Sequence, residues 1–175
     1  MNARCGFSYK SLIYITAIAV TISLSSCGKN KVKELPPATQ TGENTFGCKV
    51  NGEIWLPAGG IKPALSLVHY YQSTDGLFRF NARNYKDYES TQTFYIYVYG
   101  MFDTGFYSPM YERTYDADYD YYPDTSLSSY INITHIDLDN KIVSGLFEFH
   151  LISEDSSKSV VITEGRFDVG AVNIY

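Results

Sequence analysis

Short runs of alternating apolar and polar residues fill the chain from about Asn44 onward. In the longest run of the first half of this region, Thr93 to Phe102, the apolar residues Phe94, Ile96 and Val98 alternate with tyrosines. A period of two is typical of strands with one buried face, and a helical period is nearly absent. The other main runs are residues 65–71, 77–84, 130–138, 141–152 and 160–163.

Turn residues separate these runs. Asn51-Gly52 lies between two short strand-like segments, and this dipeptide favours a tight hairpin because it accepts positive φ at both positions. Thr74-Asp75-Gly76 and Asp139-Asn140 divide the later runs in the same way. About nine strands at this spacing predict an all-β domain, an antiparallel β-sandwich, with an up-and-down β-barrel as the alternative.

The first 27 residues have the pattern of a bacterial lipoprotein signal. Arg4 and Lys10 precede an apolar run from Leu12 to Leu24, which is short for a membrane span, and Leu24-Ser25-Ser26-Cys27 follows as a lipobox. We expect cleavage of a signal peptide of residues 1–26 and attachment of lipid (palmitate among the acyl chains) to Cys27. The alternative is an ordinary secretion signal in which Cys27 is incidental.

Residues 27–43 are poor in apolar side chains and contain Pro36-Pro37, so they predict a lipidated tether ahead of a single domain of residues 44–175. An outer-membrane lipoprotein of the cell envelope is expected. Because Gly28-Lys29-Asn30-Lys31 is basic rather than acidic, a domain that faces the periplasm is favoured over one on the cell surface.

The charge of the chain limits its partners. The formal net charge is −5, and loss of Arg4 and Lys10 with the leader makes it about −7. Nucleic acid is therefore not an expected partner, since phosphate binding needs clustered Lys and Arg. Attachment to the membrane would depend on the N-terminal lipid rather than on charge.

Cys48 is left alone once Cys5 is cleaved off and Cys27 is acylated. It lies in the strand-like run Phe46 to Val50, which favours a small buried hydrophobic residue over a nucleophile. Three glycines, Gly76, Gly145 and Gly165, each stand just before alternating apolar residues. They predict bends or bulges where strands enter the core.

No motif for catalysis is evident. His69, His135 and His150 lie in separate strand-like runs without metal-ligand spacing, and neither a nucleophile elbow nor a phosphate loop is present. We therefore expect a protein that is not an enzyme. The alternative is a hydrolase that uses paired carboxylates from the acidic segment.

The acidic segment Tyr111 to Asp124 is the most unusual stretch. Asp116, Asp118, Asp120 and Asp124 have the spacing of calcium-loop ligands, but Tyr121 replaces the turn glycine and Leu127 the bidentate glutamate. A solvated acidic loop without metal or other cofactor is the expectation, and a looser calcium site is the alternative.

Tyr95, Tyr97 and Tyr99 share one face of their predicted strand. Same-face neighbours lie about 6.5–7 Å apart, a spacing that suits contact with successive sugar rings. Tyr is also a favoured residue of half-exposed sheets, so a purely structural role is the alternative. Arg83 and Gln92 are the polar candidates to assist binding.

Both ends of the predicted domain resemble a known group of sequences. Residues 35–48, LPPATQTGENTFGC, look like the opening box of uncharacterised Bacteroidota lipoproteins, a domain of unknown function, and VSGLFEF (143–149) and ITEGRFD (162–168) resemble its closing box. The resemblance implies a lipid-anchored, β-rich envelope protein and brings no functional residues with it. Together these features predict a non-enzymatic binding module for a glycan or another envelope protein, with a purely structural envelope component as a further alternative.

Overall fold

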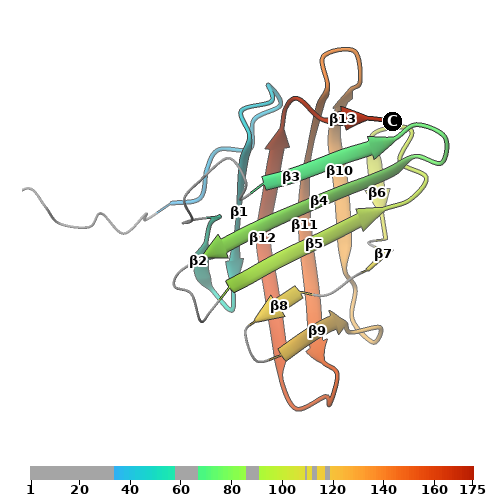
Figure 1. The fold of residues 1–175 in the computed structure, drawn as a ribbon. Coiled ribbons are helices and arrows are strands. Elements are labelled where there is room, and N and C mark those ends of the chain that lie inside the picture. Colours follow the sequence, from blue (N-terminus) through green and yellow to red (C-terminus); the bar gives the residue numbers. More distant parts are fainter. Residues whose placement is uncertain (1–33, 58–66, 86–90, 109, 112–113, 117–118) are drawn as a thin grey trace, which may run out of the picture. The chain divides into compact units, whose positions relative to one another are not determined.

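The computed structural model describes residues 34–57, 67–85, 91–108, 110–111, 114–116 and 119–175, and these residues form strands and no helix (Figure 1). The predicted all-β fold is confirmed. The thirteen strands are β1 (Thr45–Val50), β2 (Glu53–Trp55), β3 (Leu67–Gln72), β4 (Leu77–Tyr85), β5 (Thr91–Val98), β6 (Gly105–Tyr107), β7 (Met110–Tyr111), β8 (Thr114–Asp116), β9 (Tyr119–Pro123), β10 (Tyr130–Asp137), β11 (Ile142–Ser153), β12 (Ser159–Val169) and β13 (Asn173–Ile174).

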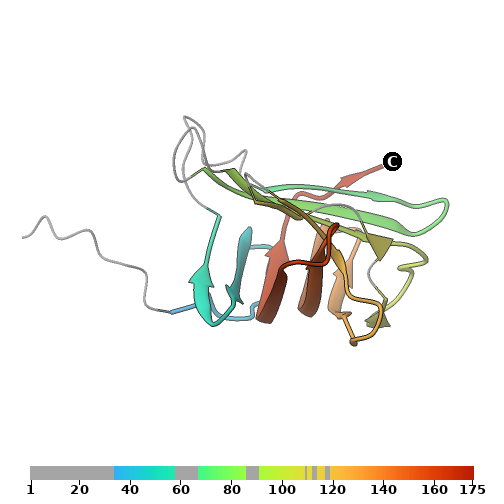
Figure 2. The same cartoon turned by 90° about the horizontal axis from the view of Figure 1, so that it is seen from below.

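The strands form two layers. One layer has the order β13-β3-β4-β5 and the other β2-β1-β12-β11-β10-β6, and the short hairpin β8–β9 connects β5 to β11. Figure 1 shows β3, β4 and β5 crossing in front of the longer strands, and Figure 2 shows the two layers edge-on. The strand order as a whole begins at β13 and ends at β2, and these two strands do not pair with each other. The fold is a sandwich and not a closed barrel.

Local turn chemistry explains the hairpins. Asn51 and Gly52 both have positive φ, 50° and 86°, and Cys48, Lys49 and Val50 pair with Trp55, Ile54 and Glu53 around them. The turn from β3 to β4 has Gly76 at φ 64°, and the turn from β10 to β11 has Lys141 at φ 60°. The predicted turns are therefore present at all three places.

Aromatic side chains fill the space between the layers. Phe46 of β1 stacks on Phe147 of β11 and on Phe80 of β4, with ring centroids 5.3 and 5.1 Å apart. Phe167 of β12 stacks on Phe80 at 5.5 Å. Trp55 and Phe147 belong to this core, since their side chains are 6% and 1% exposed.

The segment from Pro36 to Glu43, predicted as part of a tether, lies on the folded domain instead. Arg166 donates a hydrogen bond to the carbonyl of Pro36, and Thr39, Thr41, Gly42 and Glu43 donate to the Asp168 carboxylate. The folded domain thus begins well before Asn44. The reason is that Asp168 provides an anchor for backbone that is too polar and too rich in proline to pair as a strand. The signal peptide and Cys27 lie outside the described residues.

The acidic segment also differs from the prediction. Its residues 114–116 and 119–123 are the paired strands β8 and β9 rather than a solvated loop, and Tyr121 is 6% exposed. Pairing of β9 with the end of β11 turns this segment into the connection between the two layers.

Candidate functional site

The outer surface of β4 and β5 carries the tyrosines singled out by the sequence. Phe94, Ile96 and Val98 of β5 are buried against the second layer, so the alternating Tyr95, Tyr97 and Tyr99 point away from the core. Tyr95 and Tyr97 are half-buried, whereas Tyr99 is 45% exposed at the end of the strand. The three tyrosines therefore lie on one face, as predicted.

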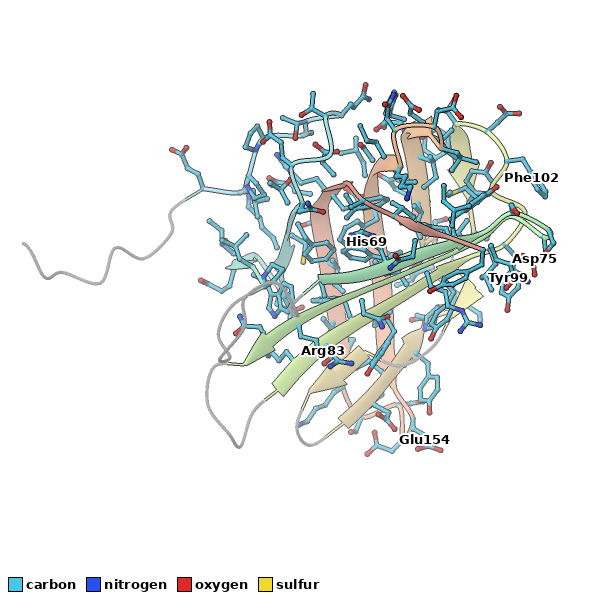
Figure 3. The ribbon with its side chains drawn as sticks, turned by 45° about the horizontal axis from the view of Figure 1, so that its top comes forward. His69, Asp75, Arg83, Tyr99, Phe102 and Glu154 are labelled. Carbon is cyan, nitrogen blue, oxygen red and sulfur yellow. The ribbon has the colours of Figure 1, made fainter. Side chains whose placement is uncertain are left out.

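Strand β4 places polar side chains beside these rings. Arg79 pairs with Tyr97, Asn81 with Tyr95 and Arg83 with Thr93, and residues directly opposite each other project to the same side. The Arg79 guanidinium lies 4.9 Å from the centre of the Tyr97 ring, in cation–π contact. We call the surface formed by Arg79, Asn81, Arg83, Tyr95, Tyr97 and Tyr99 the tyrosine–arginine face. Figure 3 labels Arg83 and Tyr99 on β4 and at the end of β5.

Asn81 occupies the middle of the tyrosine–arginine face. Its Oδ1 is covered by neighbouring atoms and accepts no hydrogen bond. A buried acceptor without a donor is energetically unfavourable, by about 1–3 kcal/mol. The Asn81 side chain thus has an unused acceptor within the tyrosine–arginine face.

Arg83 begins a row of residues that are paired from strand to strand across the sheet. Thr93 pairs with Tyr115 of β8, and Tyr115 pairs with Asp120 of β9, so Asp120 lies on the same face at the far end of that row. This face thus carries an acidic residue as well as the two arginines. Two strands, β5 and β8, separate Asp120 on β9 from Arg79 on β4.

Gln92, the other polar candidate, is on the opposite side of β5, and that expectation is wrong. Its Oε1 accepts a hydrogen bond from Trp55 Nε1 at 2.6 Å, and its neighbour Asn84 donates to the carbonyl of Leu56 at 2.9 Å. Both bonds connect β4 and β5 to the layer that contains β2. Gln92 is a structural residue because it satisfies the buried indole N–H.

Two of the candidate calcium ligands lie in paired strands rather than in one continuous loop. Asp116 of β8 pairs with Tyr119, and Asp120 of β9 pairs with Tyr115. Asp124 accepts hydrogen bonds from the backbone N–H and the hydroxyl of Ser126, and these bonds lower the pKa of Asp124. Asp118 lies outside the described residues. No cluster of three or more metal-ligating side chains occurs in the described part of the chain.

The histidines belong to three different strands. His135 is in β10 and His150 in β11, while His69 of β3 pairs with the buried Phe80 and so points into the sandwich (Figure 3). Burial lowers the pKa of His69, against the opposing effect of a backbone hydrogen bond, and its Nδ1 has no hydrogen-bond partner. A neutral, inward-facing imidazole is the result.

Asp168, which the sequence did not single out, is a buried carboxylate with several hydrogen-bond donors around it. Asp168 is 1% exposed, and its carboxylate accepts bonds from Thr39 Oγ1 (2.7 Å), Ser144 Oγ (2.8 Å) and the N–H groups of Thr41, Gly42 and Glu43 (3.0, 2.9 and 3.2 Å). Burial alone would raise its pKa, but these hydrogen bonds outweigh burial and lower the pKa to about 2. All its acceptor positions serve the fold, so Asp168 is an anchor for the N-terminal segment and not a ligand site. Only its occurrence next to Phe167 in the closing box could have drawn attention to it.

Comparisons of the chain with protein families, with curated proteins and with solved structures found no match. Among the residues placed by the structure, none belongs to a helix able to cross a membrane.

Proposed function

We propose that this protein is a lipid-anchored, non-enzymatic binding protein of the bacterial cell envelope and that its ligand is a glycan. The tyrosine–arginine face is the binding surface in this proposal. The lipobox at Cys27 supports the anchor, and the resemblance of both domain ends to Bacteroidota lipoproteins supports the envelope assignment.

One observation carries the choice of ligand: aromatic rings are displayed in a row on a sheet face, next to hydrogen-bonding side chains. Sugar rings combine an apolar face with a rim of hydroxyls, so they are bound by an aromatic ring together with polar groups. Tyr95 and Tyr97 offer ring surface, and Asn81, Arg79 and Arg83 offer polar groups at the adjacent register positions. Because these side chains follow one another along two neighbouring strands, the surface suits a chain of sugars rather than a single small molecule.

The periplasm-facing orientation is part of the proposal. The residues after Cys27 are basic, and we expect them to keep the protein on the inner leaflet of the outer membrane. The ligand would then be a polysaccharide within the envelope or one in transit through it.

A glycan array tests this function. The full-length chain, purified with its lipid in detergent, is expected to bind a subset of polysaccharides, and Tyr97→Ala is expected to abolish binding because the stacking surface is lost. Tyr97→Phe keeps the ring and should retain most of the affinity. Phe106→Ala is the matched control, since Phe106 is 73% exposed on β6 in the other layer. Absence of binding to every glycan, or equal binding by Tyr97→Ala, would contradict the proposal.

A further inference from the structure

We infer that the glycan bound on the tyrosine–arginine face is anionic, a polysaccharide that carries carboxylate or sulfate groups which Arg79 and Arg83 recognise. This inference rests on the proposed function and adds the chemical class of the ligand. Neither the tyrosines nor the fold alone would distinguish an acidic from a neutral sugar.

The two arginines lie beside the tyrosines on the same face of the sheet. Both project from β4 to the side of Tyr95 and Tyr97, and both are half-buried. They are four positions apart along the strand, a distance of roughly 13 Å between their backbone positions. Two positive charges therefore flank the aromatic row along its length, as a repeating anionic polymer would require.

The guanidinium group of arginine suits an anionic ligand. It carries five N–H donors in one plane and matches the two oxygens of a carboxylate or a sulfate with paired hydrogen bonds. Contact of the Arg79 guanidinium with the Tyr97 ring limits its motion, which lowers the entropy lost when a ligand binds.

The tyrosine–arginine face differs in charge from the chain as a whole. The formal net charge of the protein is −5, which disfavours anionic partners over most of its surface. Among the described residues of this face the charged side chains are those of Arg79, Arg83 and Asp120, and Asp120 lies at the β9 end of the Arg83 row. The Arg79 end is thus the expected position of the ligand's negative group.

Asn81 completes the surface between the arginines. Since its Oδ1 accepts no hydrogen bond, rotation of the amide toward a sugar hydroxyl would break none. An anionic group on Arg79 or Arg83 with a hydroxyl on Asn81 accounts for all three polar side chains of β4 on this face.

The experiment compares charged and neutral polymers of the same backbone. Biolayer interferometry of the full-length chain would use polygalacturonate against its methyl ester, and dextran sulfate against dextran. We expect the charged member of at least one pair to bind about tenfold or more tightly, with affinity that falls between roughly 0.05 and 0.5 M sodium chloride. The two pairs distinguish a carboxylate from a sulfate ligand.

Two variants test the assigned residues. Arg79→Gln and Arg83→Gln should each lower affinity for the charged polymer about tenfold and so reduce its advantage over the neutral one. Lys158→Gln removes the same charge from the exposed β11–β12 loop and should have no effect. Equal binding of charged and neutral polymers would overturn this inference and leave the proposed function standing. Binding to none of the four polymers would also overturn this inference, whereas the glycan array decides the proposed function.

Discussion

Phe147 covers Gly165: the two residues pair across β11 and β12, and the aromatic ring fills the space that a side chain at position 165 would need. A β-carbon on Gly165 would lie 2.5 Å from Cδ2 and Cε2 of the ring and 2.6 Å from the Phe147 carbonyl oxygen. The pairing register shifts between Phe147 and Phe149, and the adjacent Glu164 has φ 52°, so a β-bulge occurs at this point. The bulge and the missing side chain allow Phe147 to stack on Phe46 in the core.

Replacement Gly165→Ala should therefore destabilise the domain by about 1–3 kcal/mol. One of the close contacts is with a backbone oxygen, which no side-chain rotation relieves. Urea unfolding followed by tryptophan fluorescence would measure the loss, since Trp55 is buried. Gly52→Asn is the control, because nothing lies within 4 Å of a β-carbon there and Asn tolerates the positive φ. Equal urea midpoints for Gly165→Ala and Gly52→Asn would contradict a steric clash at position 165.

Local patterns predicted the central strands closely. The runs 77–84, 130–138 and 141–152 correspond to β4 (Leu77–Tyr85), β10 (Tyr130–Asp137) and β11 (Ile142–Ser153). Each has one face in the core and a turn at its end, so the residues themselves encode the period and the boundary. The run from Thr93 ends at Val98 instead of Phe102, because Gly100 takes up φ 66° and turns the chain.

Contacts between distant parts of the chain were not predictable from such patterns. The tether was extended to Glu43 because its residues are polar, yet 129 positions separate Thr39 from the Asp168 carboxylate that it binds. Likewise, nothing local shows that β9 pairs with β11 and becomes a strand. For the candidate site, alternation placed the three tyrosines on one face, whereas the register that brings Arg79 and Arg83 beside them required the fold.

Asp168→Asn should weaken the attachment of the N-terminal segment and lower the free energy of unfolding by roughly 3 kcal/mol. An amide has one acceptor oxygen, and its NH2 would face N–H groups that now donate to Oδ1 and Oδ2. Hydrogen exchange should show faster exchange of the Thr41, Gly42 and Glu43 amides. Asp139→Asn, in the exposed β10–β11 turn, is the matched control. Unchanged protection of these three amides would disprove the anchoring role.

Stability should decline in acid between about pH 4 and pH 2. The pKa of Asp168 is lowered from 3.8 to about 2 in the native state, so the native protein binds fewer protons than the unfolded chain in this interval. Its contribution, about 2 kcal/mol, is complete above pH 4 and is lost as the pH falls through the native pKa. Asp155, in an exposed turn, has a pKa of about 2 as well and titrates in the same interval. Urea midpoints measured across this range should fall less steeply in Asp168→Asn than in the parent; parallel slopes would refute the assignment.

Cys48 should resist thiol reagents in the native state. Its side chain is fully buried, and burial raises the pKa of the thiol to about 12, so almost no thiolate forms near neutral pH. We expect iodoacetamide to leave the Cys48 peptide unmodified in native buffer and to alkylate it completely in denaturant, as measured by peptide mass spectrometry. Rapid native alkylation would show that β1 opens readily, contrary to its position between β12 and β2.

Cys27→Ser should release the protein from the membrane. In the proposed anchor the Cys27 sulfur and the new amino terminus carry the lipid, and without the thiol neither acylation step proceeds. The formal charge of about −7 on the remaining chain gives no electrostatic attraction to anionic lipids that could replace the acyl chains. Fractionation of cells should thus move the variant from the membrane pellet to the soluble fraction, whereas Cys5→Ser, a matched change within the leader, should leave the protein in the pellet. Protease added to intact cells should spare the parent protein if its domain faces the periplasm. A Cys27→Ser variant that remained in the pellet would remove the basis for lipid anchoring.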